Sequence, residues 1–295
     1  PPVGATKKKK PVIIMENSQW LEEFQNYLRK NHLSQNTIVS YSAGVRLFFR
    51  LFSELTPENT GLYRSWLIKH YSPSTVNQRI FAINRFVRFV SEISEDDRLL
   101  FDGYHLHAVK LQQKSFLDAI ISNEDYELLK NRLKEEGNYF WYFVVRFLAA
   151  TGARVSELVQ IKTEHLRFGC LDLYSKGGKL RRIYFPDSLC SEALDWCRST
   201  GKITGFLFLN REGKPISARG IHQQLKYYAR KYNIDPDTVY PHSFRHRFAK
   251  NFLVRSNDIS LLADLMGHES IETTRIYLTR SSREQQKLLD EIITW

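Results

Sequence analysis

The most informative segments of the chain are PHSFRHRFA, residues 241–249, and LMGHESIETTRIYL, residues 265–278. His242 and Arg245 are three positions apart, which predicts that both lie on one side of a helical turn. His268 follows a glycine, and Tyr277 comes later in the same segment. Each of these residues is unremarkable alone. Their combination in this order is what makes them informative.

Two further segments of the same half of the chain add basic residues to this set. TGARVSEL, residues 151–158, puts Arg154 just after a glycine and near the start of a helix with an apolar face. Residues 171–185 contain two β-prone runs on either side of Gly177 and Gly178, which is a hairpin signal. Lys176 would lie at the tip of this hairpin, where glycines allow close approach to a ligand.

These four segments resemble the catalytic domain of the tyrosine recombinases, the phage-integrase family, and the chain is most similar to the single-chain, Xer-type members. The resemblance covers about residues 15–295 and includes the pattern at Ser34, Thr37 and Tyr41. It implies a mainly α fold with a small β-sheet. An N-terminal four-helix, SAM-like core-binding domain would precede a C-terminal α+β catalytic domain of the DNA breaking-rejoining type.

The resemblance also implies a role for each matching residue. The catalytic set is Arg154, Lys176, His242, Arg245, His268 and the nucleophile Tyr277. Glu157 matches the acidic residue that orients the site, and Lys179 is the alternative to Lys176 as general acid. The implied activity is cleavage and rejoining of duplex DNA through a 3′-phosphotyrosyl intermediate, in Xer-like resolution or in integration and excision of a mobile element.

The chemistry of these side chains fits that activity. A guanidinium donates two hydrogen bonds to phosphate oxygens without losing its proton, as Arg154 and Arg245 would do. A phenol with a pKa of ~10 is protonated at neutral pH, so Tyr277 needs a base, either His242 or the field of the arginines. The phosphotyrosyl link conserves bond energy, so we expect neither metal nor ATP nor any other cofactor. His242 and His246 have the spacing of a metal-binding pair but lack a third ligand.

Helical periodicity from residue 18 to residue 90 predicts four short helices that form the first domain. Polar and basic residues cluster in two of them, and such residues suit contacts with phosphates and grooves. The predicted DNA-binding residues are Ser34, Asn36, Thr37, Ser40, Ser74, Thr75, Asn77, Arg79, Arg85 and Arg88. We expect domain limits at residues 15–97 and 116–295, with a linker at 98–115. Residues 1–14 would be a basic tail, either disordered or foreign to the natural chain.

Composition agrees with a partner that is a polyanion. The chain carries 43 Lys and Arg against 32 Asp and Glu, a net charge of +11. Three cysteines without C-x-x-C spacing indicate a reducing compartment, and the longest apolar stretch, residues 139–150, is too short to cross a membrane. We therefore expect a soluble, cytoplasmic, nucleoid-associated protein that binds double-stranded DNA.

The last residues predict a second kind of partner. Leu288, Leu289, Ile292 and Ile293 form an apolar patch on a helix expected at about 283–295. This helix docks either on its own domain or on a neighbouring protomer, and the resemblance favours exchange within a dimer to tetramer on DNA. Two alternatives stay open: a type IB-like topoisomerase and a catalytically silent DNA-binding protein. Chromosome-dimer resolution, phage integration and transposon movement are all compatible with the resemblance.

Overall fold

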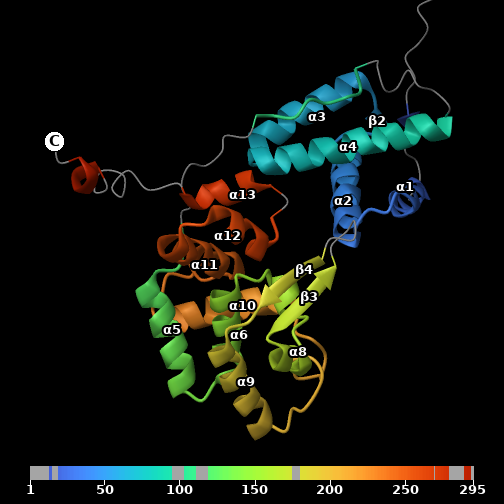
Figure 1. The fold of residues 1–295 in the computed structure, drawn as a ribbon. Helices are drawn as coiled ribbons and strands as arrows, with labels where there is room; N and C mark the ends of the chain where they lie inside the picture. The colour runs from blue at the N-terminus through green and yellow to red at the C-terminus, as the bar shows by residue number, and fades with distance from the viewer. Residues whose placement is uncertain are drawn as a thin grey trace, which may run out of the picture. The chain divides into compact units, whose positions relative to one another are not determined.

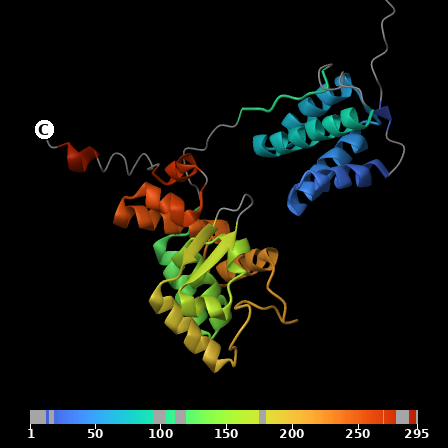
Figure 2. The same ribbon diagram turned by 45° about the vertical axis from the view of Figure 1, so that its right-hand side comes forward.

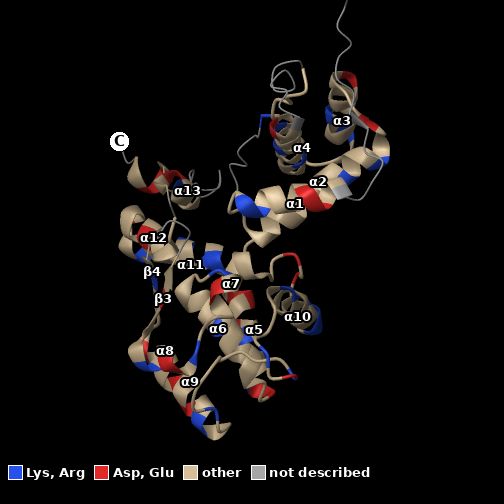
Figure 3. Ribbon diagram, turned by 90° about the vertical axis from the view of Figure 1, so that its right-hand side faces the viewer, with Lys and Arg blue, Asp and Glu red and all other residues tan. Residues whose placement is uncertain are grey.

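The computed structural model describes residues 13–14, 19–94, 103–110, 119–174, 180–268, 270–278 and 289–293. The chain divides into two compact units, residues 1–113 and residues 114–295 (Figure 1). In the described ranges both units are mainly helical, and each carries a small two-stranded antiparallel sheet. Basic and acidic residues are interspersed along their helices (Figure 3). Within these ranges, no helix combines the length and the apolar character needed to span a bilayer.

The first unit contains the four helices that the periodicity predicts. They are α1 (Gln19–Lys30), α2 (Gln35–Leu51), α3 (Pro57–His70) and α4 (Pro73–Ser94), with the paired strands β1 (Ile13–Ile14) and β2 (Glu54–Leu55). Helix α2 begins after Ser34, whose hydroxyl accepts a hydrogen bond from the Thr37 N–H and so pairs one of the free donors of the first turn. Helices α2 and α4 pack closely because position 44 is glycine. A Cβ on Gly44 would lie only 2.7 Å from Cβ of Ala82.

Residues 103–110, which the sequence pattern assigns to the linker, pack on helix α4 of the first unit. The side-chain amide of Asn84 donates to the Leu106 carbonyl and accepts from the Leu106 N–H, both at 2.9 Å. Two turns earlier on the same face of α4, Asn77 makes the same pair of hydrogen bonds with Val109, at 2.9 and 2.8 Å. Tyr104 and Leu106 are buried in the core of this unit. Two asparagines therefore hold an extended segment against a helix, as a neighbouring strand would hold it in a sheet.

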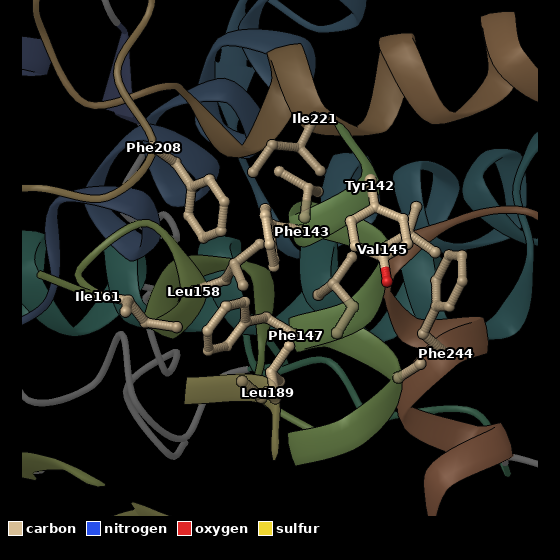
Figure 4. Packing of buried hydrophobic residues seen from close by; sticks show 14 of the residues in the cluster. Tyr142, Phe143, Val145, Phe147, Leu158, Ile161, Leu189, Phe208, Ile221 and Phe244 are labelled. Carbon is tan, nitrogen blue, oxygen red and sulfur yellow. The ribbon is translucent and has the colours of Figure 1, made fainter. Parts of the chain in front are cut away.

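The second unit is organised around a helix that is apolar on most sides. Its elements are α5 (Asn123–Glu135), α6 (Tyr139–Thr151), α7 (Val155–Leu158), α8 (Thr163–Phe168), β3 (Cys170–Tyr174), β4 (Leu180–Tyr184), α9 (Asp187–Ser199), α10 (Ala218–Lys231), α11 (Pro241–Ser256), α12 (Ile259–Met266), α13 (Ile271–Arg275) and the 3-10 turn η2 (Ile276–Leu278). Helix α6 contacts α5, α7, α9 and α11. Its Phe143 and Phe147 are fully buried among side chains such as Leu158, Phe208 and Phe244 (Figure 4). A helix of this composition must be interior, so α6 is the axis of the unit.

The hairpin predicted around the two glycines is present as strands β3 and β4 (Figure 2). The strands are antiparallel, with Leu171 opposite Ile183 and Leu173 opposite Arg181. Leu171 and Ile183 are buried, so this face of the hairpin packs on the core and the other face is open. Residues 175–179, which join the strands, lie outside the described residues.

A smaller apolar cluster joins the last elements of the unit. Its buried members are Ala249 and Leu253 of α11, Leu262 and Met266 of α12, and Tyr277 of η2. Helix α12 ends at Gly267, which adopts the left-handed conformation with φ of 59° and reverses the chain toward His268. The cluster thereby brings α11, the end of α12 and η2 to one place.

The glycine that ends α6 gives a test of this packing. Gly152 has φ of 60°, and a Cβ there would lie 2.5 Å from Cδ1 of Phe248. Gly137 also has a positive φ, of 67°, but no atom lies within 4 Å of its Cβ position. We expect Gly137→Ala to lower the free energy of unfolding by about 1–2 kcal/mol for the backbone conformation. Gly152→Ala should cost about 1–3 kcal/mol more because the new methyl group overpacks the site.

Urea unfolding of both variants beside the unmodified protein measures the difference. Equal losses for the two substitutions would contradict the close contact between Gly152 and Phe248.

Candidate active site

Arg154 is positioned by the turn between α6 and α7. After Gly152 the chain becomes extended at Arg154, which is the N-cap of α7. The Glu157 carboxylate accepts from the Arg154 backbone N–H at 2.6 Å and from Nη1 of its side chain at 2.9 Å. The Arg154 side chain is 38% exposed, whereas that of Glu157 is 10% exposed. Glu157 thus holds Arg154 from its buried side, and the guanidinium of Arg154 stays partly exposed to solvent.

Arg245 of α11 is almost completely enclosed, with 3% of the residue exposed. Its Nη1 donates to the Gly152 carbonyl and its Nη2 to the Met266 carbonyl, both at 2.6 Å. Burial, together with repulsion from Arg154 and Arg181, lowers the pKa of this guanidinium to about 10. It therefore keeps its charge at neutral pH. These contacts join the end of α6, the middle of α11 and the end of α12.

His268 lies beside Arg245, with its Nε2 2.9 Å from Nη2 of the arginine. Its Nδ1 is 2.7 Å from the Thr274 hydroxyl oxygen. A guanidinium has only donors, so Nε2 accepts here and Nδ1 carries the proton. Burial and the nearby arginines, first among them Arg245, lower the pKa of His268 to about 4. Both ring nitrogens of His268 are therefore occupied within the protein in this state.

Tyr277 is buried on η2, with 7% of the residue exposed, and its ring stacks on His268 at 6.4 Å and 12°. The histidine in contact with its hydroxyl is His246, whose Nδ1 lies 3.0 Å from Oη. Burial raises the pKa of Tyr277, and the charges of Arg245 and Arg154 oppose that rise. The pKa of His246 is lowered to about 4 by burial, by His242 and by Arg245. A neutral imidazole thus faces a neutral phenol.

The histidine in contact with the Tyr277 hydroxyl differs from the candidate base that the sequence suggests. His242, the candidate from the sequence, is one turn earlier on α11, with its ring centre 6.5 Å from that of His246. Burial and the charges of Arg245 and Arg154 lower its pKa. The i, i+4 spacing of the two histidines was weighed above as that of a metal-binding pair. The same spacing also puts both rings on one face of α11. Among the residues described, no three His, Cys, Asp or Glu gather as metal ligands would.

Sequence reasoning missed Arg181. This residue of β4 pairs through Nη1 with the same Glu157 oxygen that Arg154 contacts, and its Nη2 donates to the Leu265 carbonyl at 3.3 Å. A hollow of about 720 Å³ opens in front of this group, and Arg154, Glu157, Arg181, Gly267 and His268 contribute to its wall. Arg182, Asp172 and Asp264 also line the hollow, so guanidinium and carboxylate groups both face it. The group in its wall that suits a phosphate is the partly exposed guanidinium of Arg154. Lys176 and Lys179 lie outside the described residues.

In the first unit, helices α2 and α4 bring several of the predicted DNA-binding residues into one groove. Its volume is about 570 Å³, and its wall includes Asn36, Thr37, Ser40, Ser74 and Asn77. Asn77 is only 7% exposed, and its amide is already paired with Val109. We therefore leave Asn77 out of the DNA-contact set, since its hydrogen bonds serve the fold. Ser34 caps the start of α2. Thr75 lies in the first turn of α4, where its hydroxyl is hydrogen-bonded to that of Ser72.

The predicted arginines of the first unit are divided between structural contacts and open surface. Arg79 donates to the Ser40 carbonyl at 3.3 Å, so it bridges α4 and α2. Arg85 donates to Asn31 at 2.7 Å and lies over the ring of Tyr27. Arg88 is exposed, and Arg85 and Arg88 share a second groove of about 700 Å³. Arg88 is thus the arginine of this set that is most available to a ligand.

Comparison with known proteins supplies the class. Residues 119–284 match the family model described as the phage integrase family, and residues 21–92 match the phage integrase N-terminal SAM-like domain. The chain therefore belongs to the phage integrase family, and its resemblance to the tyrosine recombinases is confirmed.

The similar proteins include several Xer recombinases. Tyrosine recombinase XerA of Pyrococcus furiosus is 29% identical over 289 residues, which cover 94% of this chain and 96% of the relative. Tyrosine recombinase XerD of Staphylococcus haemolyticus is 26% identical, covering 92% and 97%. Among solved structures, XerH bound to a palindromic difH substrate has a TM-score of 0.69 at 18% identity, covering 94% of this chain and 95% of that one. This likeness shows that the two chains share a fold.

The predicted C-terminal helix is described only in part. Residues 289–292 are helical, and Leu289, Ile292 and Ile293 are about half exposed, at 49%, 56% and 47%. Residues 279–288, which contain the expected helix start, and residues 294–295 lie outside the described part. The exposed apolar side chains at 289–293 are consistent with a surface that another element covers.

The two neutral histidines give a pH dependence of stability. The pKa values of His246 and His268 are both about 4 in the folded protein, below the ordinary 6.5. Between pH ~6.5 and ~4 the unfolded chain binds these protons and the folded chain does not. The free energy of unfolding should therefore be fully retained above pH ~6.5 and fall as the pH is lowered toward 4.

Urea unfolding at pH 7, 5.5 and 4.5 measures this loss. The variant His246→Asn/His268→Asn has no imidazole at either position, so its stability should fall less over the same range. The same pH slope in both proteins would contradict the buried neutral histidines.

Proposed function

We propose that this protein is a site-specific tyrosine recombinase that cleaves and rejoins duplex DNA through a 3′-phosphotyrosyl intermediate, without metal or ATP. One observation carries the proposal: His268 contacts Arg245 through Nε2 and stacks on Tyr277, so a buried arginine and a phenol share one histidine. The similarity to Xer recombinases over nearly the whole chain supports the same activity.

The nucleophilic step uses the phenol of Tyr277. Its Oη attacks the phosphorus of the scissile phosphodiester, the O–H bond breaks, and the bond from phosphorus to the 5′-oxygen breaks in turn. The 3.0 Å contact supports Nδ1 of His246 as the first acceptor of the phenolic proton. The product is an ester between Tyr277 and the 3′-phosphate. Attack by the 5′-hydroxyl of a partner strand then reverses the step and releases Tyr277.

The arginines stabilise the charge that develops on the phosphate. Arg154 is exposed enough to donate directly to a non-bridging oxygen, and Arg245 adds a charge that its burial keeps unscreened. His268 becomes a donor to phosphate only if its contact with Arg245 or with Thr274 rearranges. The leaving 5′-oxygen takes its proton from Lys176, with Lys179 as the alternative.

DNA recognition falls to the first unit in this proposal. The groove between α2 and α4 offers Asn36, Thr37, Ser40 and Ser74 for contacts with the backbone and grooves of the duplex. Arg88 and its neighbour Arg85 add positive charge at the adjoining groove. We propose that the protein acts in the cytoplasm on nucleoid DNA, as a dimer to tetramer whose protomers exchange the C-terminal helix.

A nicked suicide duplex tests the chemistry. The unmodified protein should form a covalent DNA–protein adduct in the presence of EDTA, and Tyr277→Phe should form none. Arg245→Lys should slow adduct formation by about 10²–10³-fold, because lysine loses one of the two donors and the planar fork. Denaturing gel electrophoresis of labelled DNA measures the adduct and any strand exchange.

The same experiment separates the alternatives. Adduct with strand exchange supports the recombinase. Adduct with relaxation but no exchange would indicate a type IB-like topoisomerase. DNA binding without adduct would indicate a catalytically silent DNA-binding protein.

Removal of residues 283–295 tests the proposed exchange helix. A single protomer of the truncated protein should bind its DNA site as tightly as a single full-length protomer does, because no residue of the proposed DNA-contact set is lost. Recombination should disappear, since protomers can no longer dock on one another. Gel-shift titration and a two-site recombination assay measure the two properties, and Leu289→Ser/Ile292→Ser serves as a milder variant. Full recombination by the truncated protein would refute the role of the helix.

A further inference from the structure

Arg181 occupies an enclosed position behind the candidate site. Its side chain is 10% exposed and contacts Glu157 and the Leu265 carbonyl. The aliphatic part of the side chain lies against Gly267, where a Cβ would overlap its Cδ. Arg181 therefore contributes to the wall of the hollow as an enclosed side chain, and its position depends on residue 267 being a glycine.

Glu157 is shared between two arginines. Its Oε1 accepts from Nη1 of Arg154 at 2.9 Å and also from Nη1 of Arg181, while its Oε2 accepts from the Arg154 backbone N–H. The Arg154 side chain is 38% exposed and that of Arg181 is 10% exposed, so Arg154 is the outer partner and Arg181 the inner one. One negative charge thus lies between two positive charges.

This sharing decides how much positive charge Arg154 presents to a ligand. Arg154, Arg181, Arg245 and Glu157 together carry a formal charge of +2. Without Arg181 the charge falls to +1, and Glu157 would neutralise Arg154 alone. A carboxylate paired with a single guanidinium also favours a bidentate geometry, which would occupy more of the donors of Arg154.

We propose that Arg181 is a positioning residue for the reaction: it takes up part of the charge of Glu157, so that Arg154 keeps its charge and its donors for the phosphodiester. The inference rests on the function proposed above. It assigns Arg181 no contact with the substrate. Burial lowers the pKa of Arg181, and the attraction of Glu157 opposes that shift. The carboxylate thus helps to keep the buried guanidinium charged.

The neighbouring residue on the same strand shows the contrast. Arg182 pairs with Asp172 on the opposite strand through two hydrogen bonds of 2.7 Å, and its side chain is 45% exposed. Unlike Arg181 it is not enclosed, and Arg182 and Asp172 contribute to the open wall of the same hollow. The matched control is therefore taken from helix α9. Arg198→Gln removes the same charge from a side chain that is 76% exposed, pairs with Asp195 and has no part in the wall of the hollow.

The test is the single-turnover rate of covalent adduct formation on the suicide duplex. Arg181→Gln should lower the maximal rate about 10–100-fold, short of the loss of a direct donor. The protein concentration that gives half the maximal rate should change little. Arg198→Gln should stay within about twofold of the unmodified protein, as expected of an exposed pair.

The decisive variant is Arg181→Gln/Glu157→Gln, which restores the formal charge of the group to +2. It should react at least about tenfold faster than Arg181→Gln, because Arg154 regains its unshared charge. Glutamine at position 157 still offers one oxygen to the Arg154 N–H. A merely structural role predicts the opposite, since the second substitution removes further contacts. A double variant as slow as Arg181→Gln, or slower, overturns the proposal.

Arg181→Lys serves if Arg181→Gln does not fold, as judged by circular dichroism. Lysine keeps the charge beside Glu157 but has no fork to reach both Glu157 and Leu265. Its rate should lie within about tenfold of the unmodified protein, and Arg181→Lys/Glu157→Gln should not be slower than Arg181→Lys. A slower double variant would contradict the charge argument. Failure of the unmodified protein to form any adduct would refute the proposed function, whereas adduct without charge rescue would refute only the role of Arg181.

Discussion

Three consecutive carbonyls at the C-terminal end of α12 each accept a hydrogen bond from a different arginine. Leu265 accepts from Arg181, Met266 from Arg245, and Gly267 from Arg154. The last turn of any helix leaves its carbonyls without partners inside the helix and carries a partial negative charge. Because the three arginines come from β4, α11 and the start of α7, the helix end sets their mutual positions. The same end also places His268, the residue after Gly267, against Arg245.

The arginine cluster determines the protonation of its neighbours. Positive charges and burial together hold the pKa of His246 and of His268 at about 4, so both rings are neutral at physiological pH. A neutral ring can accept, which is how His268 receives the Arg245 hydrogen bond and why Nδ1 of His246 is free to meet Tyr277. The phenol itself stays protonated, because burial outweighs the arginines in setting its pKa. Nucleophile and acceptor are thus paired before any DNA is present.

Local pattern was enough to predict the helical first unit, the hairpin and the family. Local pattern was not enough where the hydrogen-bond partner of a side chain lies in a segment without helical or strand periodicity. Asn77 has the polarity of a DNA contact, but its partner at Val109 lies in a stretch with no period. Arg181 is a different case, since alternation along β4 puts it on the same face as buried Ile183. That alternation was a usable signal for an inward-facing arginine. The Glu157 partner, in contrast, required the fold.

The position of Arg181 also bears on how the proposed general acid and the proposed phosphate-binding arginine are connected. Strand β4 begins at Leu180, which follows Lys176 and Lys179 in the sequence. The next residue of the strand is anchored to Glu157, and Glu157 holds Arg154. In the proposed mechanism the lysine protonates the leaving oxygen and Arg154 binds the same phosphate. A single carboxylate therefore connects strand β4, which follows the proposed general acid in the sequence, with the arginine proposed to bind the anion.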